Sequence, residues 1–171
     1  MTDPAVACRY HYLGYTTLVG AQMRYAVHDR NGCPVAMLGL STAAWILAPR
    51  DTLIGWTSEV RQKNLRLVVD NPRFLILPWI KIPYLGSHIL AIMCRRLPAD
   101  WTRRYNITPV LIETFVQTPR FTGAVYRASG WIHVGTTKRR GHCDTRKKRD
   151  KPKKDIWVRP LRRDWKRILN R

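Results

Sequence analysis

The sequence predicts an α/β domain in which a mixed central sheet is flanked by helices and carries a basic insertion near the C-terminus. Three observations lead to this prediction. Short apolar and β-branched runs alternate with amphipathic stretches. A hydrophobic content of 45% over 171 residues is enough for one core. Residues 137–171 hold 16 Lys and Arg against 4 Asp and Glu, within a net charge of +20.

The first two elements are expected to form a β-hairpin. Residues 22–29 and 33–48 are rich in strand-forming side chains. Asn31 and Gly32 lie between them and are suited to the positive φ of a tight turn. We therefore predict two antiparallel strands that end close to residue 48.

The middle of the chain alternates helix and strand. A helix is expected to begin at Thr57 or Ser58, which are good N-caps, and to end near residues 70–72. Residues 73–83 then form an apolar run of strand length. Pro78 inside this run indicates a bulge or a splayed end, because proline cannot donate to a ladder.

The second half opens with a helix that begins at Gly86 and is expected to stop at Pro98. Its start would direct backbone N–H groups toward any bound anion. Trp165, Ile168 and Leu169 are expected to share the buried side of a last, basic helix. Between these two helices we expect a short helix at residues 98–105, a strand at 109–116, a helix at 119–130 and strands at 131–136 and 155–161.

These elements divide the chain into three parts. We predict a core at residues 1–136, a basic flexible insertion at 137–154, and a strand and helix at 155–171 that complete the core. The four cysteines show no CxxC spacing and are expected to be reduced thiols in a cytoplasm. No secretion signal and no apolar run of roughly 20 residues is visible, so no membrane contact is predicted.

The excess positive charge favours a phosphate polymer as partner, since DNA and RNA are the common ligands of such density. A membrane surface and a solvated tail are the alternatives. Trp101 and Trp165 are candidates for stacking on unpaired bases. The predicted nucleic-acid-binding residues are Lys138, Arg139, Arg140, Arg146, Lys147, Lys148, Arg149, Lys151, Lys153 and Lys154, with Arg103 and Arg104 as an extension.

One stretch, "AVYRASGWIHVGTT", resembles a motif of the GNAT acyltransferases, and "GSHILAIM" resembles the start of their cofactor-binding helix. The resemblance implies a GNAT-like fold, Tyr126 near a thioester sulfur, and Gly86 and Ser87 as cofactor-binding residues for acetyl-CoA. The turn "KIPYLGSH" departs from the family, because only Gly86 remains and Pro83 withdraws a donor. We therefore expect a degenerate cofactor loop and no bound cofactor, with an active N-acyltransferase as the alternative.

Most of residues 10–161 resembles a more specific family, that of component A of the Druantia anti-phage system, also associated with mobile elements. This resemblance implies a bacterial defence or mobile-element setting. Relatives usually carry a segment before "YHYLGY", so a first strand and helix are expected to be missing or supplied by a protein or ribonucleoprotein partner. A homodimer is a further expectation. The resemblance rests on "YHYLGY", "GAQMRY", "LGLSTAAWILAPRDTLIGW", "RQKNLRLVVDNPRFLILPWIKIPYLGSHIL", "RRLPADWTRRYNITPVLIETFV", "FTGAVYRASGWIHVGTTKRRG" and "KKDIWVRPL".

Three residues are candidates for catalysis. Glu113 lies in the middle of an apolar strand, where a carboxylate serves as a general base or a metal ligand, or else forms a salt bridge with one of the nearby arginines. His88 at the helix start is the second candidate. The acyltransferase alternative uses Glu113 as base and Tyr126 as acid, and a third function, a nuclease or a nucleic-acid-modifying subunit, uses Glu113 and His88. "HCDTR", residues 142–146, is not expected to bind a metal.

Overall fold

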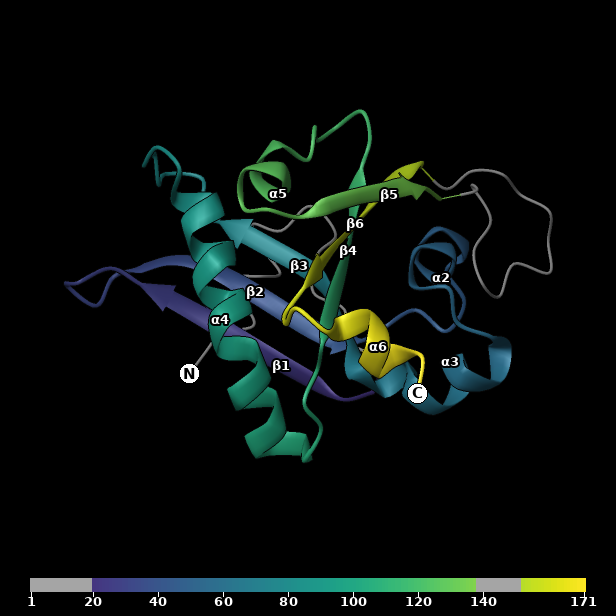
Figure 1. Ribbon diagram of the computed structural model, residues 1–171. Helices are drawn as coiled ribbons and strands as arrows, with labels where there is room; N and C mark the ends of the chain where they lie inside the picture. Colours follow the sequence, from purple (N-terminus) through teal and green to yellow (C-terminus); the bar gives the residue numbers. More distant parts are fainter. Residues whose placement is uncertain (1–19, 138–151) are drawn as a thin grey trace.

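The structure is a computed structural model that describes residues 20–137 and 152–171 (Figure 1). This part contains a six-stranded sheet with the strand order β1-β2-β3-β4-β6-β5. Only β3 and β4 are parallel neighbours. The strands are β1 (Gln22–His28), β2 (Pro34–Thr42), β3 (Val68–Ile76), β4 (Leu111–Gln117), β5 (Ile132–Thr136) and β6 (Lys154–Pro160). The predicted mixed sheet of an α/β domain is confirmed.

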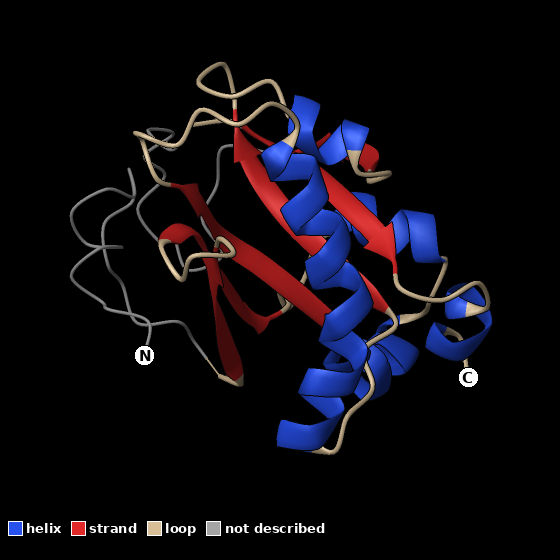
Figure 2. Ribbon diagram, turned by 90° about the vertical axis from the view of Figure 1, so that its left-hand side faces the viewer, coloured by secondary structure: helices blue, strands red, loops and turns tan. Residues whose placement is uncertain are grey.

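Helices lie on both faces of the sheet, and the long helix α4 crosses one face (Figure 2). Val69 and Ile112 belong to the apolar cluster beneath α4. Their neighbours Val68 and Leu111 point the other way, into a cluster with residues of α2 and α6. The helices of the described part are α2 (Ala48–Ile54), α3 (Ser58–Asn64), α4 (Leu85–Tyr105), α5 (Ala124–Ala128) and α6 (Trp165–Leu169), with a 3-10 turn at Leu65–Leu67.

The hairpin of β1 and β2 is confirmed, but the second strand is shorter than predicted. It ends at Thr42, and α2 occupies Ala48–Ile54. Pro49 explains the helix, because a proline in the first turn has no N–H that needs a partner there. In the hairpin turn Gly32 has positive φ and Asn31 does not. The side chain of Asp29 accepts the backbone N–H groups of Asn31 and Cys33.

The predicted end of a helix at residues 70–72 is wrong. The helix α3 ends at Asn64, and β3 begins at Val68. Val68 and Val69 are buried on opposite faces of the sheet, which only a strand makes possible. The strand then stops at Ile76, before Pro78, so the apolar run 73–83 is half strand and half loop.

The helix α4 does not stop at Pro98 but continues to Tyr105. A proline inside a helix costs roughly 3 kcal/mol. Leu97 and Trp101 are both buried against the sheet, and burying each such side chain contributes about 1.5–3 kcal/mol. The continued packing therefore offsets the proline. Asn106, with φ +54°, ends the helix and donates its N–H to Thr102.

The last helix agrees with the prediction, since Trp165 and Leu169 of α6 are buried and Ile168 packs beside them. None of the helices in residues 20–137 and 152–171 has the length and apolarity that a bilayer crossing demands.

Candidate functional site

The site is organised around the point where β3 and β4 separate. The two strands pair only over Val68–Asp70 and Leu111–Glu113, although both continue beyond it. Pro72 follows the last paired residues of β3 and has no N–H to donate to a neighbouring strand. The side chain of Asn71 donates instead to two backbone oxygens, each at 2.9 Å. A gap in the middle of the sheet results.

A cavity of about 360 Å³ lies at this gap. Its walls come from both separating strands, from α5 and from the connection before α5. Apolar cavities with a few polar groups are the usual form of small-molecule sites. The residues that line it include Phe74, Ile76, Thr114, Val116, Gly123 and Tyr126.

Tyr126 lies on α5 and is almost fully buried at the wall of the cavity. Its ring meets Trp131 edge to face at 5.1 Å between centroids and stacks on Trp157 at 6.5 Å. Gly123 lets this cluster close, since a β-carbon there would lie 2.6 Å from the ring of Trp157. The predicted site residue Tyr126 is therefore held rigidly between two tryptophans.

The start of α4 faces α5. A β-carbon on Gly86 would lie 2.6 Å from Cγ2 of Val125, so this glycine allows the two helices to approach. The hydroxyl of Ser87 donates to the backbone oxygen of Tyr84 at 2.9 Å. His88 is exposed. Gly86 and Ser87 thus have local structural roles at the place where the resemblance expected a cofactor.

Residues 77–84, which connect β3 to α4 and are called the aromatic loop below, differ from a glycine-rich phosphate loop. Trp79, Ile82 and Tyr84 are exposed apolar side chains within this segment. Tyr84 has φ +59° and ψ 2°, a left-handed conformation that costs a non-glycine residue of the order of 1–3 kcal/mol. Prolines at 78 and 83 remove two further N–H donors.

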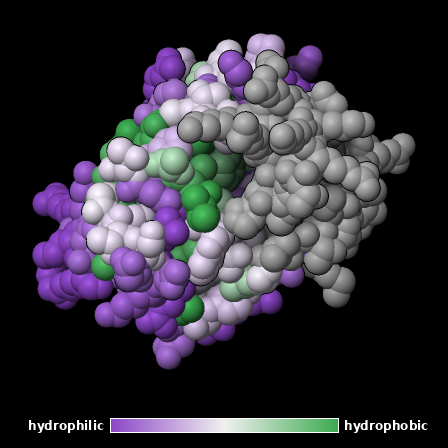
Figure 3. All heavy atoms as spheres, turned by 90° about the vertical axis from the view of Figure 1, so that its right-hand side faces the viewer, coloured by the Kyte–Doolittle hydropathy of each residue, from purple (hydrophilic) through white to green (hydrophobic). Residues whose placement is uncertain are grey.

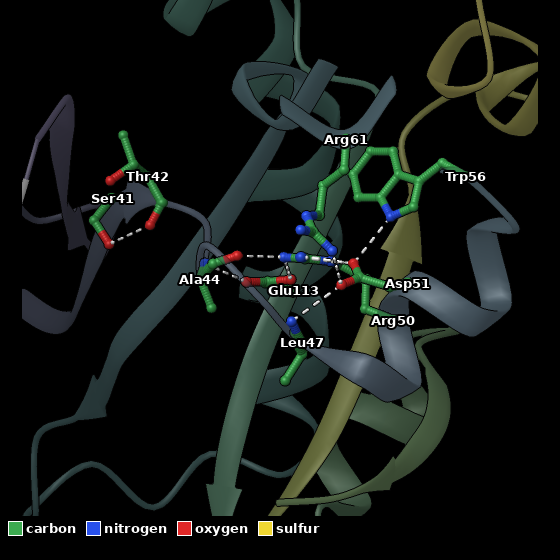
Figure 4. A network of polar contacts seen from close by, with 9 residues as sticks. All are labelled: Ser41, Thr42, Ala44, Leu47, Arg50, Asp51, Trp56, Arg61 and Glu113. Carbon is green, nitrogen blue, oxygen red and sulfur yellow. Dashed lines mark hydrogen bonds and ion pairs between the residues drawn. The ribbon is translucent and has the colours of Figure 1, made fainter. Parts of the chain in front are cut away.

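Glu113 lies on the other face of the sheet in a buried polar network (Figure 4). Its side chain is fully buried and accepts the N–H of Ala44 and a guanidinium N–H of Arg50, both at 2.8 Å. Arg50 is also fully buried and pairs with Asp51 at 2.8 Å. Burial raises the pKa of Glu113, while Arg50 and the Ala44 N–H act against that shift. The ion pair with an arginine, one of the two predicted roles, is present.

The network extends through Asp51, which serves as its hub. Its carboxylate accepts the indole N–H of Trp56 at 3.0 Å and the backbone N–H of Leu47 at 3.2 Å. A guanidinium nitrogen of Arg61 lies 3.4 Å from the same carboxylate. Nearly every polar atom of the network is therefore paired, as buried charges require.

Asp70 is a buried acid that the sequence analysis missed. It is the register partner of Glu113 across the parallel pair, and its Oδ1 has no hydrogen-bond partner among the described residues. Burial, followed by the charge of Glu113, raises its pKa well above the ordinary value. The signal was available as an acid directly after two valines, "VVD", but it was interpreted as the end of a helix.

The three catalytic candidates do not converge. Glu113 contacts the α2 side of the sheet, while Tyr126 belongs to the cluster beneath α4. His88 lies exposed near the start of α4. Of the three, Tyr126 alone lines the cavity.

The predicted basic residues lie in two separate places. Arg103 and Arg104 are exposed in the last turn of α4, at the lower end of the molecule in Figure 1. Lys153 and Lys154 lie where β6 begins, in the upper part of that view. Lys138, Arg139, Arg140, Arg146, Lys147, Lys148, Arg149 and Lys151 lie outside the described residues.

The two tryptophans proposed for stacking are buried, so that expectation is wrong. Trp101 lies on the buried side of α4, where it is 2% exposed and packs on Tyr105, and Trp165 is 8% exposed in the cluster with residues of α2 and α6. Helical periodicity placed each on an apolar face, which is the stronger signal for a core position. The exposed aromatic side chains of the described residues are Trp45, Trp79, Tyr84 and Phe121.

Comparison with known proteins gives one family and one fold. A family model described as Druantia protein DruA matches residues 5–148, most of the chain. No curated protein matches the sequence.

Solved acetyltransferases share the fold at low identity. Spermidine N-acetyltransferase from Vibrio cholerae, in complex with CoA and spermine, is 10% identical with a TM-score of 0.54, over 83% of this chain and 67% of that one. A putative phosphinothricin N-acetyltransferase is 15% identical, with a TM-score of 0.53 over 82% and 72%. A GNAT superfamily phosphinothricin acetyltransferase from Sinorhizobium meliloti, in complex with AcCoA, is 16% identical, with a TM-score of 0.51 over 81% and 60%. The chain therefore has a GNAT acetyltransferase fold.

Proposed function

Since the chain belongs to the Druantia protein DruA family, which implies a role in anti-phage defence, we propose that it binds nucleic acid within that role. The observation that carries the proposal is the imbalance of charge at the surface. Glu113, Asp51, Asp100 and Asp164 are all in ion pairs with arginines of the chain. Most lysines and arginines of the described part are exposed. The outward field is therefore positive, as binding of a phosphate polymer requires.

One basic surface is built by α3 and α6, which contact each other. The buried side chain of Asn64 donates to the backbone oxygens of Leu169 and Arg171, at 3.1 and 3.0 Å, and so fixes the last helix against α3. Figure 3, which faces the side of α2 and α3, shows hydrophilic residues over its lower left part. The exposed basic residues of the two helices and their ends are Lys63, Arg66, Arg163, Lys166, Arg167 and Arg171.

The predicted basic insertion is attached to the paired ends of β5 and β6. Thr137 donates its N–H to the oxygen of Lys154 at 2.8 Å, and the Lys154 N–H returns to the Thr137 hydroxyl at 3.0 Å. The residues between them add nine lysines and arginines and two aspartates. We propose that this segment supplies most of the phosphate contacts, on DNA or RNA.

The test is a salt series of binding to labelled duplex DNA, single-stranded DNA and structured RNA, measured by anisotropy. For duplex DNA the logarithm of the affinity should fall with the logarithm of salt, with a slope of about −0.9 for each phosphate contact. Replacing residues 138–151 with a neutral linker should flatten that slope. A chain that binds none of the three polymers at low salt would overturn the proposal.

Two charge-matched variants locate the remaining contacts. One changes Lys63, Arg66, Lys166 and Arg167 to glutamine, and the other makes the same change at Arg95, Arg96, Arg103 and Arg104. Both remove four charges, so a general electrostatic effect would lower the slope equally. A larger effect of the first variant would assign the contacts to α3 and α6, and the reverse result would support the predicted role of Arg103 and Arg104.

A second candidate function is acyl-CoA-dependent N-acyl transfer, which is favoured by the cavity at the gap between β3 and β4. The Vibrio cholerae and Sinorhizobium meliloti enzymes contain CoA and AcCoA in their structures. In this chain Gly86 and Ser87 would face the cofactor phosphates, and Tyr126 at the cavity wall would serve as acid for the leaving thiolate. The predicted role of Glu113 as base has no support from the geometry, because its carboxylate is buried on the other face of the sheet in the pair with Arg50.

Calorimetric titration with acetyl-CoA tests this second function. Binding that is lost when Phe74→Trp narrows the cavity, together with acetylation of an amine that is lost in Tyr126→Phe, would support it. Absence of binding by the folded protein would overturn it.

A further inference from the structure

The aromatic loop presents apolar side chains to solvent where a soluble domain ordinarily has polar ones. Trp79 is 56% exposed, Ile82 is 55% exposed and Tyr84 is 87% exposed. Contiguous apolar side chains on a surface mark interaction sites, while single ones are ordinary. Three within eight residues indicate a surface that another molecule covers.

The loop is held in one shape. The Ile80 N–H donates to the oxygen of Leu77 at 2.9 Å, which closes a turn after β3. The oxygen of Tyr84 accepts the N–H of His88 and the hydroxyl of Ser87. Two prolines restrict φ at positions 78 and 83. Rings presented by such a loop lose little conformational entropy on binding.

The backbone of Tyr84 shows that the position of its ring is not explained by packing. A tyrosine in the left-handed region is unfavourable, and a ring that is 87% exposed recovers almost nothing by burial. Glycine would adopt the same φ without strain. The side chain at this position therefore serves something other than the stability of the described chain.

The surroundings of the loop favour an anionic partner. Residues 71–84, from the second half of β3 through the loop, contain Arg73 and Lys81 and no acidic residue. Lys81 lies inside the loop and is exposed between the two aromatic residues. Aromatic rings next to positive charge are the pattern by which proteins hold single strands, because bases stack on the rings while lysine and arginine attract the phosphates.

We propose that the aromatic loop is a stacking site for the unpaired bases of single-stranded nucleic acid, with Trp79 and Tyr84 as the stacking rings. The inference rests on the proposed nucleic-acid binding and adds to it a preference for single strands. In a duplex the faces of the bases are already stacked on one another, so the rings have nothing to contact there. The basic surfaces attract any phosphate polymer, and the loop distinguishes single from double strands.

The experiment compares a labelled single strand with the duplex of the same sequence, at a salt concentration that weakens duplex binding. The test variant is Trp79→Ala with Tyr84→Gly, which removes both rings but no charge. The glycine also relieves the backbone strain, so a fall in affinity cannot come from an unfolded protein if the thermal midpoint is kept. Trp45→Ala is the control, because Trp45 is a tryptophan of similar exposure, 48%, in the connection between β2 and α2.

We expect the test variant to bind the single strand roughly ten- to a hundredfold more weakly, since stacking contributes about 1–3 kcal/mol per base. Duplex affinity and the salt slope should remain within a factor of about two, because the charges are unchanged. The control should match the wild type on both ligands.

Two results would overturn the inference, and they are distinguishable. If the wild type binds single strands and the test variant binds them equally well, the stacking site is wrong, the nucleic-acid function stands, and the loop is left as a surface for a protein partner. If the wild type binds neither ligand even at low salt, the proposed function fails and the stacking site fails with it.

Discussion

The buried polar network of Arg50, Asp51 and Glu113, here called the Arg50 network, departs from the usual distribution of side chains in one direction, and the aromatic loop departs from it in the other. In the network, three charged groups are placed inside the protein, at Arg50, Asp51 and Glu113, and their hydrogen bonds are made within the chain. In the loop, three apolar groups are placed outside, and the burial that would stabilise them is not provided by the described residues. The charges of the first region are paired within the fold, whereas the apolar side chains of the second are largely exposed.

This difference separates structural from functional roles. A buried polar group whose partners are all present is explained by the folded chain itself. An exposed ring in a strained backbone is not, and it needs a partner. By the same criterion Glu113 belongs to the structure, whereas Asp70, with an unpartnered Oδ1 among the described residues, stands between the two.

The largest effect is expected when the network is broken. Arg50→Met would leave Glu113 buried without its cation and would remove one partner of Asp51, and breaking a buried ion pair costs about 3–5 kcal/mol. The measurement is urea unfolding of the purified domain. Combining Arg50→Met with Glu113→Gln should recover part of the loss, since no uncompensated charge then remains at position 113. A loss below about 1 kcal/mol for the single variant would place the network among weak surface interactions.

Much of the fold was predictable from apolar patterns. The runs around Ile112, Ile156 and Leu169 each appear in the structure as the expected strand or helix. The errors lie at prolines: Pro49 begins a helix, and Pro98 sits inside one. Local rules treat proline as a boundary, but the packing of residues distant in sequence decides whether an element continues past it.

The site was less predictable, because its contacts are long-range. The sequence indicated that Glu113 is buried and that an arginine was a possible partner, but that arginine is 63 residues away. Asp70 was hidden by an incorrect helix boundary. Trp101 and Trp165 are predicted to be available for stacking but are buried, whereas Trp79 and Tyr84 are exposed. Composition predicts that aromatic residues are available for binding, and only the fold shows which of them reach the surface.

Asp70 gives a pH-dependent prediction of intermediate size. Its pKa in the folded state is raised above the ordinary 3.8, so the folded state binds the proton more tightly than the unfolded state does. The stabilisation that the protonated Asp70 contributes is therefore fully present at pH values below 3.8. It is lost as the pH rises through the raised pKa of the folded state. Asp70→Asn keeps the shape and removes the titration, so it should be more stable than the wild type at neutral pH, by about 1–3 kcal/mol.

The decisive quantity for Asp70 is the difference in unfolding free energy between the two proteins across a pH series. It should grow from weakly acidic to neutral pH. The pKa of Glu113 is raised as well, so the pH dependence of the wild type alone does not isolate Asp70. A difference that stays constant with pH would mean that Asp70 titrates normally.

The smallest effect tests the aromatic loop without any ligand. Tyr84→Gly should stabilise the fold by about 1 kcal/mol, because glycine adopts φ +59° without the steric conflict that a β-carbon creates. The gain is reduced by the greater freedom of glycine in the unfolded chain. Asn106→Gly, at the other non-glycine position of positive φ in the described residues, is the matched comparison, and asparagine tolerates that region better than tyrosine. A larger gain at Tyr84 than at Asn106 would show that the chain retains a strained aromatic residue although a less strained alternative exists, as expected of a residue kept for binding. A loss of stability in Tyr84→Gly would mean that the ring packs and that the loop belongs to the structure, like the Arg50 network.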